Sequence, residues 1–88
     1  MKINFTEHAE NQLQERNISK NNVINVIQHP EQIIESRYGR KVIQKKVKVK
    51  NKLKLFRVVV ENYPVEPLVI TMYLTSRIDK YWSLQDED

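Results

Sequence analysis

The stretch from Arg37 to Arg57 constrains the fold of this chain more than any other feature. It contains ten of the 15 lysines and arginines and no aspartate or glutamate. The basic residues of this stretch are Arg37, Arg40, Lys41, Lys45, Lys46, Lys48, Lys50, Lys52, Lys54 and Arg57. They alternate with valine, isoleucine, leucine and phenylalanine, which is typical of β-strands rather than of a disordered basic tail. We therefore expect a folded sheet with a strongly basic surface.

A basic sheet surface attracts polyanions, because each phosphate that a lysine neutralises releases condensed counterions. RNA and DNA are the usual polyanions, so nucleic-acid binding is the first interpretation. The competing interpretation is solubility, since lysines on an exposed strand discourage edge-to-edge aggregation. The charge pattern by itself leaves both interpretations open.

The composition excludes several classes of function. The chain has 88 residues, of which 40% are hydrophobic, so we expect one domain over residues 1–88 with too small a core for a large cofactor cavity. It has no cysteine, and its histidines and carboxylates lack the spacing of metal ligands, so we expect neither metal nor cofactor.

No signal peptide or apolar span is evident, which predicts a cytoplasmic protein with no membrane partner. Residues 83–88 are expected to form a flexible acidic tail.

The first third of the chain predicts a short strand and two helices. Met1 to Phe5 has the character of a short strand, after which Thr6 is a suitable N-cap for a helix that reaches about Arg16. Ser19 is the expected N-cap of a second helix, which ends before Pro30 because proline cannot continue a helix.

From Glu31 onward the pattern changes to β-branched runs separated by turn residues. The expected strands are Gln32 to Arg37, Lys41 to Val49, Leu53 to Asn62 and Leu68 to Thr75. Short connections favour antiparallel pairing of consecutive strands. The sequence thus predicts an α+β fold in which two N-terminal helices pack on a four-stranded antiparallel sheet, with a short C-terminal helix or turn.

Alternation within the last two strands separates an apolar face from a polar one. Arg57 stands on an otherwise apolar strand face with Leu55 and Val59, and a guanidinium in such a place requires a specific partner. In the final strand, Thr71, Tyr73 and Thr75 alternate with residues that are all apolar. We expect Arg57 to share the polar face with these three residues and with lysines of the preceding strand.

Four short motifs resemble those of a family of small prokaryotic domains of unknown function. They are Thr6-Glu7-His8-Ala9, Glu15-Arg16-Asn17-Ile18-Ser19, Thr75-Ser76-Arg77 and Lys80-Tyr81-Trp82. The resemblance extends from about Phe5 to Trp82, and the order of elements is similar to that of the RelE/ParE toxin superfamily. RelE-like toxins cut messenger RNA, usually on the ribosome, whereas ParE-like relatives act on DNA gyrase.

The resemblance implies a RelE-like domain that engages RNA, including ribosome-bound RNA, and extends to a metal-independent endoribonuclease toxin with a cognate antitoxin protein as partner. Such cleavage needs an acid and a base, and cations that stabilise charge on the phosphate. His8 is then the candidate acid or base, Arg57 and Arg77 the candidate phosphate clamp, and Tyr81 a candidate for stacking or proton transfer. The candidate nucleic-acid-binding residues are Lys41, Lys45, Lys46, Lys48, Lys54, Tyr73 and Thr75.

Several residues of these motifs and strands also have a purely structural interpretation. His8 lies beside an apolar helix stripe and suits packing, Arg16 suits an exposed helix end, and Arg57 suits an ion pair with Glu61 or Asp79. Two alternative functions therefore remain open. One is a non-catalytic nucleic-acid-binding module, in which loss of His8 leaves function intact. The other is a ParE-like protein-interaction or inhibitor domain that docks an acidic polypeptide.

Overall fold

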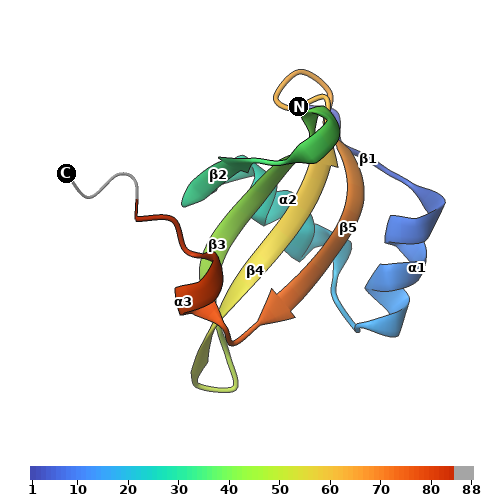
Figure 1. Cartoon of the computed structure of the whole chain (residues 1–88). Coiled ribbons are helices and arrows are strands. Elements are labelled where there is room, and N and C mark those ends of the chain that lie inside the picture. The colour runs from blue at the N-terminus through green and yellow to red at the C-terminus, as the bar shows by residue number, and fades with distance from the viewer. Residues whose placement is uncertain (85–88) are drawn as a thin grey trace.

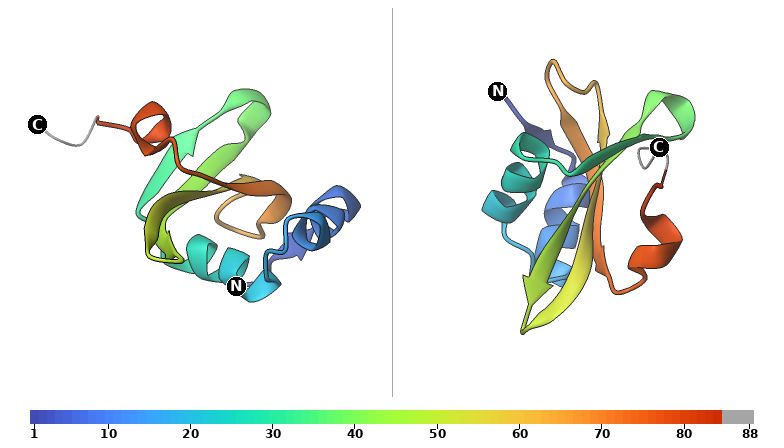
Figure 2. Two further views of the ribbon diagram at one scale, coloured as in Figure 1. Left: turned by 90° about the horizontal axis from the view of Figure 1, so that it is seen from below. Right: turned by 90° about the vertical axis from the view of Figure 1, so that its left-hand side faces the viewer.

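The computed structural model describes residues 1–84, and it places two helices on one face of a β-sheet and a third, shorter helix on the opposite face (Figure 1, Figure 2). The elements in chain order are β1 (Asn4–Phe5), α1 (Glu7–Glu15), α2 (Lys20–Gln28), β2 (Gln32–Glu35), a 3-10 turn (Arg37–Gly39), β3 (Lys41–Val49), β4 (Lys52–Glu61), β5 (Leu68–Thr75) and α3 (Ile78–Tyr81). Within residues 1–84, no helix has the length and apolar character needed to cross a lipid bilayer.

The sheet has five strands in the order β1-β5-β4-β3-β2, and it is mixed rather than antiparallel. β1 runs parallel to β5, with Asn4 opposite Leu68. The Asn4 amide donates a hydrogen bond to the Pro67 carbonyl at 2.9 Å. The four-stranded antiparallel sheet expected from the sequence is therefore wrong. The reason is that β1 contributes only two residues, which is too short a run for alternation to show that it joins the sheet.

Both helices begin where the sequence predicts. The Thr6 hydroxyl accepts a hydrogen bond from the Ala9 amide at 3.0 Å, and the Ser19 hydroxyl accepts one from the Asn22 amide at 3.1 Å. These side chains satisfy amides that have no partner within the first turn of a helix. Two N-caps thus fix where α1 and α2 begin.

The apolar core lies between these two helices and the sheet. Its buried residues are Ala9, Leu13, Ile18, Val23, Val26, Ile27, Ile43, Phe56, Val58, Val60, Val69 and Met72. Val69 joins the same side as Met72 because the register between β4 and β5 shifts at Val59 and Val60. Such an irregularity adds one residue to a strand and reverses the alternation beyond it.

Side chains occupy the open edges of the sheet beyond the two short outer strands. On β5, the Met72 carbonyl accepts a hydrogen bond from Arg16 Nη1 at 2.7 Å, and the Ile70 carbonyl accepts one from the Thr6 hydroxyl at 3.4 Å. On β3, the Lys46 amide donates to Glu31 Oε1 at 2.7 Å. Arg16 is therefore more than an exposed helix end, because its guanidinium joins the α1–α2 turn to the sheet.

The C-terminal segment returns to the sheet face that α1 and α2 leave uncovered (Figure 2). Here α3 is followed by Trp82 and Ser83, and the Ser83 amide donates to Gln32 Oε1 at 3.0 Å. The acidic tail was expected over residues 83–88. Ser83 is hydrogen-bonded to the sheet, and residues 85–88 lie outside the part of the chain that the structure describes.

Candidate nucleic-acid interface

Four polar side chains lie side by side across four strands, and we call them the polar row. They are Gln32 on β2, Gln44 on β3, Arg57 on β4 and Tyr73 on β5, and each pairs directly with the next in the sheet register. Paired residues of neighbouring strands project to the same face. Because Ile43 and Val58, the neighbours of Gln44 and Arg57 along their strands, belong to the helix-covered core, the polar row lies on the opposite face.

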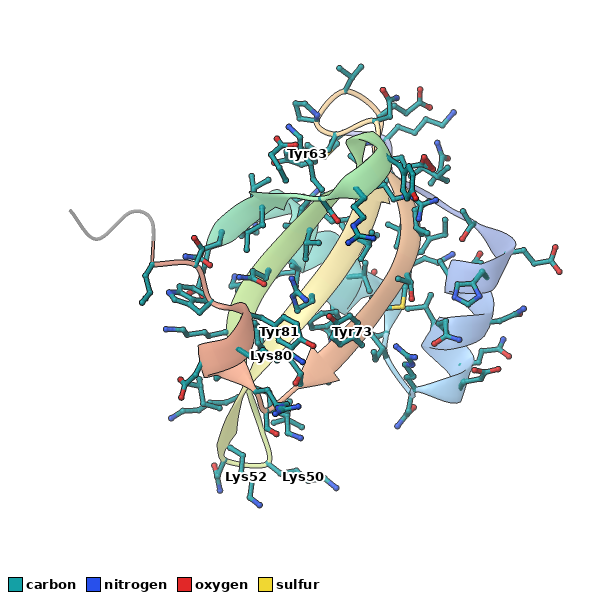
Figure 3. The ribbon with its side chains drawn as sticks, in the orientation of Figure 1. Lys50, Lys52, Tyr63, Tyr73, Lys80 and Tyr81 are labelled. Atoms are coloured by element: carbon teal, nitrogen blue, oxygen red, sulfur yellow. The ribbon has the colours of Figure 1, made fainter. Side chains whose placement is uncertain are left out.

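Arg57 is at the centre of the row and is held by two neutral groups. Its Nε donates to Gln44 Oε1 at 2.9 Å, and its Nη1 donates to the Tyr73 hydroxyl at 2.6 Å. The guanidinium carbon lies 4.1 Å from the centroid of the Tyr81 ring, a distance suited to a cation–π interaction. The two tyrosine rings meet edge to face, with centroids 6.4 Å apart (Figure 3).

No carboxylate neutralises this guanidinium within residues 1–84. Glu61, one of its expected partners, instead pairs with Arg40 at 3.9 Å, and Asp79 forms no ion pair in the described chain. The alternative interpretation of Arg57 as one partner of a simple ion pair is thus wrong. Among the described residues, the buried side-chain atoms that lack a hydrogen-bond partner are Gln12 Oε1 and Arg40 Nε. Arg57 Nη2 forms no hydrogen bond in the described chain and is not among these buried atoms, so it is in contact with solvent. A half-buried cation that keeps free donors is suited to bind an external anion.

Gln44 connects the polar row to the C-terminal segment. Its side chain is fully buried, and its Nε2 donates to Gln32 Oε1 at 2.8 Å and to the Tyr81 carbonyl at 3.1 Å. Gln32 Nε2 in turn donates to the Ser83 carbonyl at 2.6 Å. The two amides therefore fix the backbone that carries Tyr81, and through it the ring that covers Arg57.

Sequence reasoning did not identify Gln44 or Gln32 as site residues. A signal for Gln44 was present, because it directly follows the apolar pair Val42-Ile43 in a strand where every other polar residue is a lysine. A glutamine on the solvent-facing side of a strand gives the same signal, so the pattern alone does not show burial.

The predicted nucleic-acid-binding residues divide between the two faces of the sheet. By alternation from Gln44 and Arg57, the residues on the polar-row face are Lys46, Lys48, Tyr73 and Thr75. Lys46 Nζ lies 4.0 Å from the centroid of the Trp82 ring. Lys41, Lys45 and Lys54 project to the helix side, where Lys41 pairs with Glu35 at 3.3 Å and Lys45 Nζ contacts Asn25 Oδ1 at 3.5 Å. One basic surface was expected, and the lysines form two.

The four predicted catalytic residues are not brought together. Arg57 and Tyr81 are in contact, whereas His8 is exposed on α1, which covers the opposite face of the sheet. Arg77 is exposed at the start of α3, where its amide donates to the Thr75 hydroxyl at 3.0 Å. Within residues 1–84 no three histidines or carboxylates are grouped as metal ligands. The geometry supports phosphate binding by paired donors beside two phenols, without an imidazole at the same place.

The chain belongs to a protein family described as Domain of unknown function (DUF4258), whose members it matches over residues 5–74. The matched region contains Gln32, Gln44, Arg57 and Tyr73 and ends before Tyr81. No curated protein and no solved structure matches the chain.

Proposed function

We propose that this member of the DUF4258 family engages RNA and that Arg57 receives one of the RNA phosphates. The observation that carries the proposal is the state of the Arg57 guanidinium, which is half-buried, held by Gln44 and Tyr73, and without a carboxylate in the described chain. Removing a charge from water is costly unless an opposite charge compensates for it. A phosphate supplies that charge and accepts paired N–H donors.

The surroundings of Arg57 favour a polymeric anion over a small free one. Lys46 and Lys48 follow on the same face at two-residue intervals, so that further phosphates meet further cations. Trp82 is half-buried beside Lys46, and aromatic rings next to cations are typical of surfaces that stack nucleic-acid bases. RNA is proposed over DNA on the resemblance to RelE-like domains.

A finer proposal is that the protein is a metal-independent endoribonuclease toxin, similar to the RelE branch of the RelE/ParE superfamily and held inactive by an antitoxin. Its support is the contact of Arg57 with two phenols, Tyr73 and Tyr81, which are capable of proton transfer. His8 has no part in this proposal, because it lies on the other side of the sheet. If cleavage occurs, loss of His8 should leave it unchanged.

RNA binding by purified variants tests the proposal directly. Fluorescence anisotropy with a labelled RNA should show that Arg57→Gln weakens binding at least tenfold, and that Arg57→Lys weakens it less but clearly, since lysine cannot form paired donors. Lys45→Gln is the matched control, because it removes the same charge on the helix side of β3. Equal losses in Arg57→Gln and Lys45→Gln would contradict a specific phosphate site.

Expression in cells separates binding from cleavage. Growth arrest accompanied by new RNA 5′ ends, both abolished by Arg57→Gln and Tyr81→Phe but not by His8→Ala, supports the ribonuclease proposal. RNA binding without new ends indicates a non-catalytic module.

A further inference from the structure

The outer part of the β3–β4 hairpin extends beyond the rest of the sheet as a two-stranded ribbon. β2 pairs with β3 only as far as Gln44, and β5 pairs with β4 only from Leu55 onward. Residues 47–54 thus have no third strand beside them, and they project past the end of β5 (Figure 1). We call residues 47–54 the lysine ribbon. At about 3.3 Å per residue it is roughly 10 Å long.

Half of the ribbon residues are lysines, and none is acidic. The lysines are Lys48, Lys50, Lys52 and Lys54. Within residues 1–84 none of them forms an ion pair, whereas Lys20 pairs with Glu10 at 2.9 Å and Lys41 pairs with Glu35 at 3.3 Å. The ribbon therefore concentrates positive charge that the protein itself leaves uncompensated.

The turn of the ribbon has an unusual residue for its conformation. Lys50 and Asn51 connect Val49 to Lys52, and both have positive φ angles, of 52° and 66°. Two-residue turns of this kind strongly favour asparagine, aspartate or glycine, because other side chains are strained there. Asn51 follows this preference and Lys50 does not. Lys50 thus places a positive charge at the tip of the hairpin, although the positive φ angle at this position disfavours lysine (Figure 3).

The ribbon lysines are distributed over both of its faces. By alternation, Lys48 lies on the polar-row face, whereas Lys52 and Lys54 lie on the helix side, and Lys50 is at the tip between them. A single extended strand of RNA lies along one face and leaves the lysines of the other unused. Two phosphate backbones that approach each other closely meet the lysines of both faces at once. The walls of the deep, narrow major groove of an A-form helix are such a pair of backbones.

We propose that the lysine ribbon binds paired RNA by lying along the mouth of the narrow major groove of an A-form helix, where lysines of its two faces contact the two phosphate backbones that border the groove. The inference rests on the proposed RNA engagement and names its substrate class as double-stranded RNA. Recognition is by phosphate contacts and is independent of sequence, since side chains cannot reach the base edges in that deep, narrow groove. In this arrangement Arg57 receives a phosphate at the base of the ribbon.

Binding of three labelled probes tests the inference: an RNA stem of about 16 base pairs, a single-stranded RNA of equal length and a DNA duplex of the same sequence. We expect the wild-type protein to bind the RNA stem at least tenfold more tightly than either of the others. The ribbon variant Lys48→Gln/Lys52→Gln removes one lysine from each face. It should lose at least tenfold in stem affinity and reduce the slope of log affinity against log salt by about 2.

The matched control is Lys2→Gln/Lys20→Gln, which removes the same charge outside the ribbon, at lysines that pair with Glu66 and Glu10, and should lose less than threefold. Equal losses in the two double variants, or equal affinity for the stem and the single strand, would overturn the inference while leaving RNA engagement at Arg57 intact. Preference for the DNA duplex would overturn it as well, because the partner would then be DNA. If no RNA binds at all, the proposed function fails together with the inference.

Discussion

The two faces of the sheet are covered in physically different ways. On one face, α1 and α2 bury a continuous apolar core that includes Ile43 and Val58. On the other face, the C-terminal segment is attached through hydrogen bonds of Gln32 and Gln44 and through rings placed over Lys46 and Arg57. Apolar burial therefore supplies most of the stability on the helix-covered face. On the opposite face, directional polar contacts hold the Arg57 guanidinium in place.

The sharpest test of this difference uses neighbouring residues on opposite faces, and the larger effect is expected for Ile43→Ala. Ile43 is fully buried in the helix-covered core, so its truncation should lower the free energy of unfolding by about 3 kcal/mol. Urea denaturation followed by far-UV circular dichroism measures the loss. RNA affinity per folded molecule should stay within twofold of wild type. A large loss of affinity in folded protein would show that the two faces are not separable.

A smaller loss of stability, about 2 kcal/mol, is expected for Gln44→Leu, which keeps the size of the side chain but removes its amide. Arg57 then loses an acceptor, and the Tyr81 carbonyl loses a donor. RNA affinity should fall several-fold, whereas it should stay close to the wild-type value in Ile43→Ala.

The fluorescence of Trp82, the single tryptophan, reports on the C-terminal segment. In the Gln44→Leu variant this fluorescence should change at lower urea than the circular dichroism signal of the core. Coincident transitions in the variant would contradict a separate attachment of the segment.

The smallest change in the free energy of unfolding is expected in the lysine ribbon, which extends beyond the rest of the sheet. Lys50→Asn places a residue that tolerates positive φ at the turn and should raise the free energy of unfolding by about 1 kcal/mol. Thermal unfolding measures the gain, and Lys52→Asn, at a position in a strand, is the control that should show none. A destabilised Lys50→Asn protein would refute the strain assigned to the turn.

The sequence predicted local features well, because these depend on few neighbouring residues. The N-caps at Thr6 and Ser19 and the unusual position of Arg57 on an apolar strand face follow from short-range chemistry and alternation. The prediction that Arg57 shares a face with Tyr73 and Thr75 is confirmed by the strand register.

Features that depend on contacts between distant segments were not predictable in the same way. The parallel pairing of Asn4 with Leu68 leaves no pattern in a two-residue strand. The division of the lysines between two faces depends on strand register, and the position of His8 depends on which face α1 covers. Gln44 was missed because burial of a polar side chain depends on partners elsewhere, here Gln32 and Arg57.

The side chains at the sheet edges have a consequence for the behaviour of the protein at high concentration. A β-strand from a second molecule can join a sheet only through free amides and carbonyls at its border. Arg16 already occupies the Met72 carbonyl on one border, and Glu31 occupies the Lys46 amide on the other. An incoming strand that pairs with β5 beyond β1, or with β3 beyond β2, must displace a charged side chain, which opposes growth into cross-β aggregates at these two places.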